Sequence, residues 1–168
     1  MTRQPDIGLD IEVTDAQGRV LAEANSTWRG WKGFRELDLK DNSDRLLLTY
    51  RIAPPRPGHF FSARPLLLAD GAGRALGTLQ TRFDGWKGRR FSLLRPDGRD
   101  LVVPHISRRQ ENPLLLGQQT VGSVGKRGGL LSTFSLRFTQ PCDHLQAVGL
   151  LVFVAVRAGH TSTVGTRG

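Results

Sequence analysis

The strongest constraint on how this chain folds is an internal repeat with a period of 55 residues. When residues 15–39 are aligned with residues 70–94, ten of the 25 positions are identical. A third, partial copy follows, because the Pro-Leu-Leu-Leu run of 65–68 recurs at 113–116. Self-similarity at a fixed period indicates one supersecondary unit that is used more than once. We therefore predict repeated units over residues 10–64 and 65–119.

Within each copy, turn residues separate short segments of extended structure. An Asp followed by a Gly, as in Asp15–Gly18 and Asp70–Gly73, is typical of tight turns, because Asp accepts backbone N–H bonds and Gly adopts positive φ. Phe134–Phe138 alternates apolar and polar residues, as a half-buried strand does. This pattern of successive hairpins predicts a mostly β fold, an antiparallel β-barrel or sandwich. The 168 residues suit one domain, which we place at 1–160.

One apolar segment near the C-terminus breaks the β pattern. Ala147–Val156 is almost wholly apolar, with Asp143 placed as an N-cap and Gly159 placed as a C-terminal glycine. These signals predict a helix over 143–158, although the β-branched valines favour a strand and uniform apolarity does not decide between the two. A bilayer span needs about 20 residues, and this apolar segment is too short to be expected to cross a membrane. A helix that is apolar all round must be enclosed, so we expect the barrel to surround it. The small, polar residues 161–168 are expected to form a loose tail.

The net charge of +9 is concentrated in the second half of the chain. Residues 1–84 carry 12 basic and 11 acidic groups, whereas residues 85–168 carry 12 basic and 4 acidic groups. Such asymmetry indicates an anionic partner, either nucleic acid or a membrane surface. A coding habit that favours arginine is the competing explanation, since 20 of the 24 basic residues are Arg. With 7% aromatic residues and no recognition helix, nucleic acid is the weaker candidate.

The basic residues of this half cluster at three places that the loops of a barrel would bring together. They are the candidate anion-binding residues Lys87, Arg89, Arg90, Arg108, Arg109, Lys126 and Arg127. A scatter of solvated charges is the alternative interpretation. The Gly-Trp-Lys-Gly segments at 30–33 and 85–88 are expected to be tight connections, because a binding site would not need both copies.

No pattern in the chain indicates catalysis or a metal site. None of the four histidines is paired with another His, a Cys or a carboxylate at metal-ligand spacing. Cys142 and His144 are close in sequence, but such positions at a helix start do not face each other. No nucleophile elbow, phosphate-binding loop or dinucleotide motif is present. We expect a non-enzymatic monomer without metal or cofactor. The single Cys and the lack of an apolar stretch after Met1 predict a cytoplasmic location, at most peripheral to a membrane.

Repeated hairpins followed by one apolar helix resemble the tubby C-terminal-like superfamily, and within it the phospholipid scramblase and LURP-one-related branch. Residues 66–77 look like the family's D-x-x-G-x-x-L-G hairpin, and Val121–Arg127 is similar to its G-x-I-x-K strand. Phe134–Phe138 leads through Pro141 and Asp143 into the apolar segment, as in the family. The resemblance covers about residues 7–160. It implies an antiparallel barrel of about twelve strands around a hydrophobic helix.

The resemblance also carries an expectation about function. Tubby relatives bind phosphoinositides through basic residues, whereas the LURP-one-like group mostly lacks a defined activity. Scramblases have an acidic calcium-binding stretch where this chain has Leu131-Ser132-Thr133, which offers no carboxylate, so we expect no calcium site. The expected function is recognition of anionic phospholipid or phosphoinositide headgroups at a membrane surface. A structural or protein-interaction barrel and a nucleic-acid-binding module remain as alternatives.

Overall fold

The fold is mostly β with one helix near the C-terminus, as the sequence predicts. The structure, a computed structural model, describes residues 8–27, 36–53, 65–83, 89–106, 111–127, 132–158 and 162–167. The strands are β1 (Gly8–Thr14), β2 (Val20–Thr27), β3 (Glu36–Asp41), β4 (Leu46–Ile52), β5 (Leu66–Asp70), β6 (Ala75–Phe83), β7 (Arg89–Leu94), β8 (Leu101–Val103), β9 (Asn112–Leu116), β10 (Gln119–Arg127), β11 (Ser132–Phe138) and β12 (Ser162–Arg167). The helix α1 spans His144–Ala158 and precedes β12.

Strands β1 to β11 form a continuous antiparallel sheet in which each strand pairs with the next one along the chain. β12 differs, because it pairs in parallel with both β11 and β1. The order of hydrogen-bonded neighbours is therefore β1, β12, β11 and then each preceding strand in turn down to β2. The expectation of a purely antiparallel sheet is therefore wrong at this strand. A parallel neighbour needs a long crossover connection, and α1 provides it between β11 and β12.

The expectation of a loose tail at 161–168 is also wrong. Residues 162–167 form β12, with Ser162 opposite Ser132 of β11 and Ile11 of β1. Composition misled here, because small polar residues form no recognisable strand pattern on their own. Two neighbouring strands supply the backbone hydrogen-bonding partners that hold such a segment extended.

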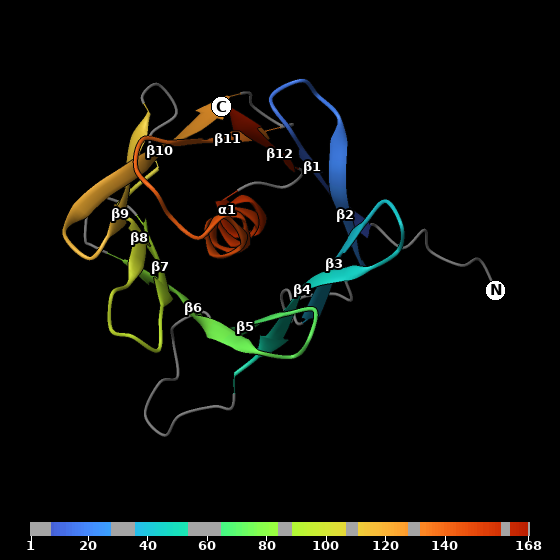
Figure 1. Ribbon diagram of the computed structural model, residues 1–168, viewed down its shortest axis with the longest axis horizontal. Coiled ribbons are helices and arrows are strands. Elements are labelled where there is room, and N and C mark those ends of the chain that lie inside the picture. The colour runs from blue at the N-terminus through green and yellow to red at the C-terminus, as the bar shows by residue number, and fades with distance from the viewer. Residues whose placement is uncertain are drawn as a thin grey trace.

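Helix α1 lies in the middle of the strands when the molecule is viewed end-on (Figure 1). Every residue from Leu150 to Ala155 is buried, at 2% exposure or less, so the helix is covered on all sides over this stretch. Its start is capped as predicted, since the Asp143 carboxylate accepts a bond from the Gln146 N–H at 3.0 Å. The Tyr50 hydroxyl of β4 donates to the Gly149 carbonyl at 3.0 Å. Burial from every direction explains why this helix lacks a polar face.

The 55-residue shift places β1 and β2 on β5 and β6, and the turns between them have the same geometry. In each turn an Asp carboxylate accepts two backbone N–H bonds and the Nε–H of an Arg four residues later, in the pairs Asp15–Arg19 and Asp70–Arg74. The β3–β4 turn repeats this arrangement with Asp41 and Arg45. Its positive φ of 62° belongs to Asp44, where the other two turns have Gly.

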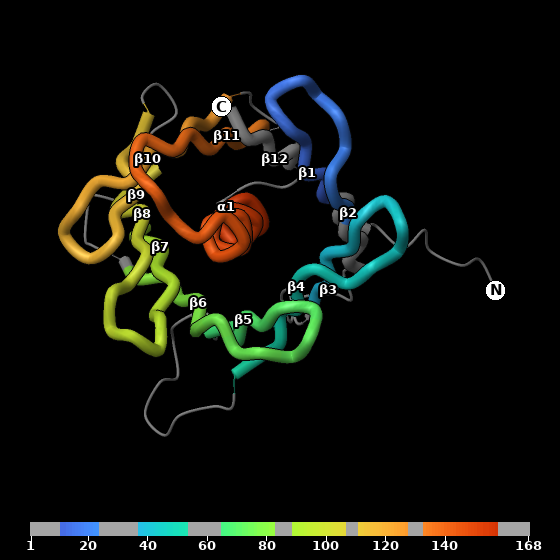
Figure 2. Tube along the Cα trace, in the orientation of Figure 1, coloured from blue at the N-terminus to red at the C-terminus, as the bar shows by residue number. Residues whose placement is uncertain are grey.

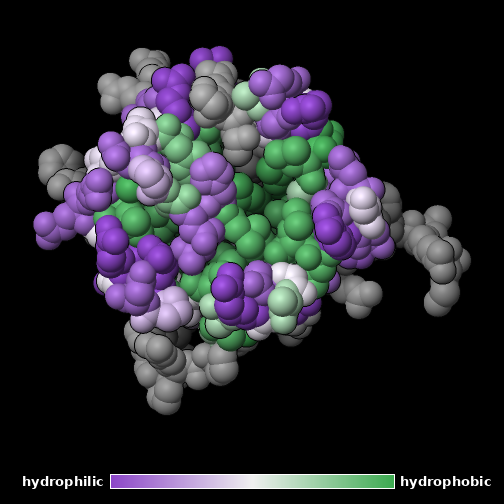
Figure 3. Space-filling model, viewed as in Figure 1, coloured by the Kyte–Doolittle hydropathy of each residue, from purple (hydrophilic) through white to green (hydrophobic). Residues whose placement is uncertain are grey.

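The antiparallel order gives the sheet two distinct ends. The turns β1–β2, β3–β4, β5–β6, β7–β8 and β9–β10 all lie at one end, which we call the turn end (Figure 2). β11 ends and α1 begins there as well. The opposite end, where β6 ends, β7 begins and β10 ends, is called the basic end below. In the space-filling view, hydrophilic residues surround a hydrophobic interior (Figure 3).

Candidate anion-binding surface

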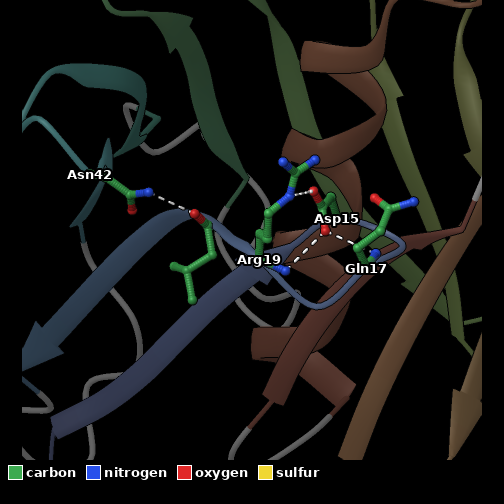
Figure 4. A network of polar contacts seen from close by, with 5 residues as sticks. Asp15, Gln17, Arg19 and Asn42 are labelled. Carbon is green, nitrogen blue, oxygen red and sulfur yellow. Dashed lines mark hydrogen bonds and ion pairs between the residues drawn. The ribbon is translucent and has the colours of Figure 1, made fainter.

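At the turn end, positive and negative side chains neutralise each other. The Arg19 Nε lies 2.7 Å from the Asp15 carboxylate, and the corresponding distances are 3.0 Å for Arg45–Asp41 and for Arg74–Asp70. Figure 4 shows the first of these turns, with the Asn42 amide donating to the Val20 carbonyl at 2.7 Å and so joining two neighbouring turns.

The same contacts shift the titration of the three turn aspartates. The hydrogen bond from the backbone N–H of the paired Arg, supplemented by its side chain, lowers the pKa of Asp15, Asp41 and Asp70. These carboxylates therefore stay charged and engaged at neutral pH. The turn end offers little net positive charge to an anion.

The basic end holds the predicted residues that the structure describes. Arg89 and Arg90 begin β7, and Lys126 and Arg127 end β10. The expectation that these four lie on loops is wrong, because strand pairing extends through them. Lys87, Arg108 and Arg109 lie outside the described residues.

The outer surface of the β6–β7 hairpin carries two arginines directly opposite each other. Arg82 of β6 is in register with Arg90 of β7, and both side chains are exposed. Directly opposed residues have their Cβ atoms about 5 Å apart, and like charges there are destabilising. Within the described part of the chain neither arginine forms an ion pair with a carboxylate. An anion that contacts both guanidinium groups would relieve their repulsion.

Arg89 lies on the other face of the same hairpin, toward the helix. It is in register with Phe83 and two residues before Phe91, which is buried against Phe153 of α1. Its Nη1 donates to the Arg157 carbonyl in the last turn of α1 at 2.8 Å. A cation at this position stabilises the negative end of the helix dipole. Arg89 therefore has a structural role that the outward-facing Arg90 does not share.

Lys126 and Arg127 divide in the same way. Lys126 is in register with the buried Phe134 and so faces inward, where its Nζ lies 5.5 Å from the centre of the Phe134 ring. Arg127 is exposed and faces outward, opposite Thr133. The predicted set therefore contains two inward-facing and two outward-facing side chains among the residues the structure describes.

Arg82 and Arg157 lie at this end and are absent from the set of residues predicted from the sequence. Arg82 belongs to the same hairpin as Arg90, but only the strand register shows that they are opposed. Arg157 lies in the last turn of α1, where a basic residue is common for dipole reasons alone. The signal that could have found Arg82 is its place in the hairpin strand immediately before the repeated Gly-Trp-Lys-Gly segment.

The only described cysteine lies at the start of α1. Burial, more than the neighbouring Asp143 charge, raises the pKa of the Cys142 thiol. His144 stacks on Phe138, with the ring centres 4.2 Å apart and the rings nearly parallel.

Among the described residues, no group of three His, Cys, Asp or Glu side chains converges as metal ligands would. In that same part of the chain, every helix is too short or too polar to cross a bilayer.

Comparison with known proteins found no matching family model, no matching curated protein and no matching solved structure.

Proposed function

We propose that this protein is a non-enzymatic, tubby-like β-barrel that binds anionic phospholipid headgroups at a membrane surface through its basic end. The cyclic order of strand pairing and the buried helix α1 support the barrel. The distribution of charge supports the mode of binding, since the ion-paired aspartates of the turns lie at one end and the exposed, directly opposed Arg82 and Arg90 lie at the other. Such a molecule would approach an anionic surface with its basic end foremost.

The observation that carries this proposal is the exposed pair Arg82 and Arg90. Two opposed cations reduce the stability of the hairpin because they repel each other. A ligand that neutralises both charges removes this repulsion, and it is therefore bound more tightly than a ligand that contacts one isolated cation. The exposed Arg127 adds a further positive charge at the same end of the sheet.

The expected contribution of the pair is measurable. A basic residue near an anionic membrane contributes about 1 kcal/mol, which falls off within a Debye length. Replacing both arginines by glutamine should therefore weaken vesicle binding by about 2 kcal/mol, roughly 30-fold, at moderate salt.

Vesicle co-sedimentation tests the proposal with a matched control. Arg82→Gln/Arg90→Gln is compared with Arg99→Gln/Arg137→Gln, which removes the same charge from exposed residues toward the turn end. We expect binding to vesicles containing phosphatidylserine or phosphoinositide, not to pure phosphatidylcholine, and a loss confined to the first variant. Equal losses in both variants would show that only net charge matters. Absence of vesicle binding would overturn the proposal and leave the structural or protein-interaction barrel, or, with a shift in a nucleic-acid gel, the nucleic-acid module.

A further inference from the structure

Strand β12 lies between β1 and β11, the first and last strands of the antiparallel sheet (Figure 1). Successive antiparallel strands alternate in direction, so β1 and β11 both run toward the turn end. A strand placed between them pairs in parallel with both, as β12 does along Ile11–Thr14 and Ser132–Arg137. We call this position, between these two ranges, the seam. Without β12 the seam has two free strand edges, whose backbone N–H and C=O groups are a template for a strand of another chain.

The sequence of β12 specifies its place in the seam only weakly. It reads Ser-Thr-Val-Gly-Thr-Arg, in which Val164 is the one large apolar residue. The two neighbouring strands differ from it, because β1 contributes the buried Ile11 and Val13. β11 contributes the buried Phe134 and Leu136. Strands that are polar in both alternating sets of residues, or that contain glycine, are prone to alternative pairing and domain swapping. Backbone hydrogen bonds therefore hold β12 in the seam, and β12 of a second copy supplies the same bonds.

The connection to β12 determines how two copies would meet. Residues 159–161 alone separate α1 from β12, and three residues span at most about 10 Å. α1 ends at the basic end, and β12 begins there, with its first residue opposite Ser132 of β11. A strand that crosses to a second copy through so short a connection brings the basic ends of the two copies together.

We propose that β12 is an exchangeable strand, and that in a symmetric dimer β12 of each chain occupies the seam of the other. The contacts of β12 with β1 and β11 are the same before and after the exchange, which makes domain swapping a low-cost route to a dimer. A short linker holds β12 at its own seam at an effective concentration on the order of millimolar, so the monomer dominates in dilute solution. This inference does not depend on binding to a membrane.

Charge opposes the exchange at low ionic strength. The exposed Arg90 and Arg127 lie at the basic ends that would meet, and like charges repel. The Debye length falls from about 10 Å in 0.1 M salt to about 3 Å in 1 M salt, so concentrated salt removes most of this repulsion. We therefore expect exchange to increase with both protein concentration and salt.

Disulfide trapping between two variants of the full chain tests the exchange. Glu12 of β1 is directly opposite Thr163 of β12. One variant carries Glu12→Cys, the other carries Thr163→Cys, and both carry Cys142→Ser. The two are unfolded, mixed, refolded together at high protein concentration in about 1 M NaCl, and oxidised. We expect a disulfide-linked heterodimer, identified by its mass, because the two new thiols meet only when β12 of one chain pairs with β1 of the other.

The β1–β2 hairpin gives a matched control. Glu23 of β2 is also directly opposite Glu12, but it belongs to a hairpin whose strands stay together. A mixture of Glu12→Cys with Glu23→Cys, treated in the same way, should give no heterodimer beyond chance contacts. A single chain carrying both Glu12→Cys and Thr163→Cys should form the disulfide internally when it is oxidised in dilute solution. Light scattering should then find this locked chain monomeric at the concentration where the wild type forms dimers.

Several results would overturn the exchange. These are equal amounts of heterodimer in the two mixtures, no heterodimer in either, or dimers of the internally locked chain. Circular dichroism establishes that each variant is folded, and failure of the folded double variant to form its internal disulfide would refute the pairing of β12 with β1. A heterodimer yield that falls as NaCl is added would refute the meeting of the basic ends.

Discussion

Gly149 lies in the interior of α1, where it faces buried leucine side chains of β4 and β5. A Cβ atom at this position would be 2.6 Å from Cδ2 of Leu68 and 3.5 Å from Cδ1 of Leu48. Both leucines are buried, at 1% and 0% exposure, so neither has open space to move into. The Tyr50 hydroxyl fixes the same turn of the helix by its bond to the Gly149 carbonyl. We expect that Gly149→Ala destabilises the protein, opposite to the usual effect of this substitution in a helix.

The size of the effect follows from two opposing contributions. Alanine is favoured over glycine in a helix interior by about 1 kcal/mol. Adding a methyl group to a filled core costs about 1–3 kcal/mol. The net change for Gly149→Ala is therefore a loss of about 1 kcal/mol in the free energy of unfolding. In a Leu68→Ala background the colliding methyl groups are gone, and the same substitution should stabilise by about 1 kcal/mol.

Urea unfolding, followed by circular dichroism, is measured for the wild type, Gly149→Ala, Leu68→Ala and the double variant. It gives the change in the free energy of unfolding caused by Gly149→Ala in each background. Leu68→Ala alone is expected to cost about 2–5 kcal/mol because it leaves a cavity. The coupling between the two positions should be about 2 kcal/mol, with unchanged dependence on urea concentration. If Gly149→Ala stabilises the wild-type background by about 1 kcal/mol, the close packing of α1 against β5 is refuted.

Two further outcomes concern the turns and a strand glycine. Asp15→Asn should lower stability at neutral pH, because the carboxylate has a lower pKa in the folded chain than its ordinary 3.8. The stabilisation by the Asp15 carboxylate is complete above pH 3.8 and is lost as the pH falls through the lower pKa of the folded state. The free energies of unfolding of wild type and Asp15→Asn, measured in urea, should therefore become equal in acid. A constant difference between them down to low pH would contradict this prediction. Gly77→Ala should cost about 2 kcal/mol or more, because φ is 152° and a Cβ would collide with the Leu94 carbonyl oxygen. Gly18→Ala, at a φ of 79° in open space, should cost only about 1 kcal/mol, and equal losses would show that the collision is relieved.

Much of the local structure could be predicted from residue types alone. The Asp15 and Asp70 turns, the strand at Phe134–Phe138 and the helix capped by Asp143 all follow from short-range chemistry, and the structure contains each of them. The third turn escaped notice, because Asp44 takes the positive φ that the other turns give to glycine. A pattern search based on glycine does not find an aspartate in that conformation.

The candidate site was predictable only in part. Clustered basic residues indicated which segments carry positive charge, and Arg89, Arg90, Lys126 and Arg127 do lie at one end of the sheet. Their division into inward-facing and outward-facing side chains could not be foreseen. It depends on strand register, since a shift by one residue moves every side chain to the other face.

Residue types and their local order specify the features that act over a few residues: the Asp–Arg hairpin turns, the short strands between them, the apolar helix with its cap, and the excess of positive charge. Which residues meet across the chain depends on packing between distant segments. Only strand register opposes Arg82 to Arg90, and only the docking of α1 brings Arg157 to Arg89 and Gly149 against Leu68. The parallel pairing of β12 likewise depends on the end of the sheet at which α1 ends and β12 begins. Local patterns encode torsion preferences and burial, whereas these contacts arise from packing between segments far apart in sequence.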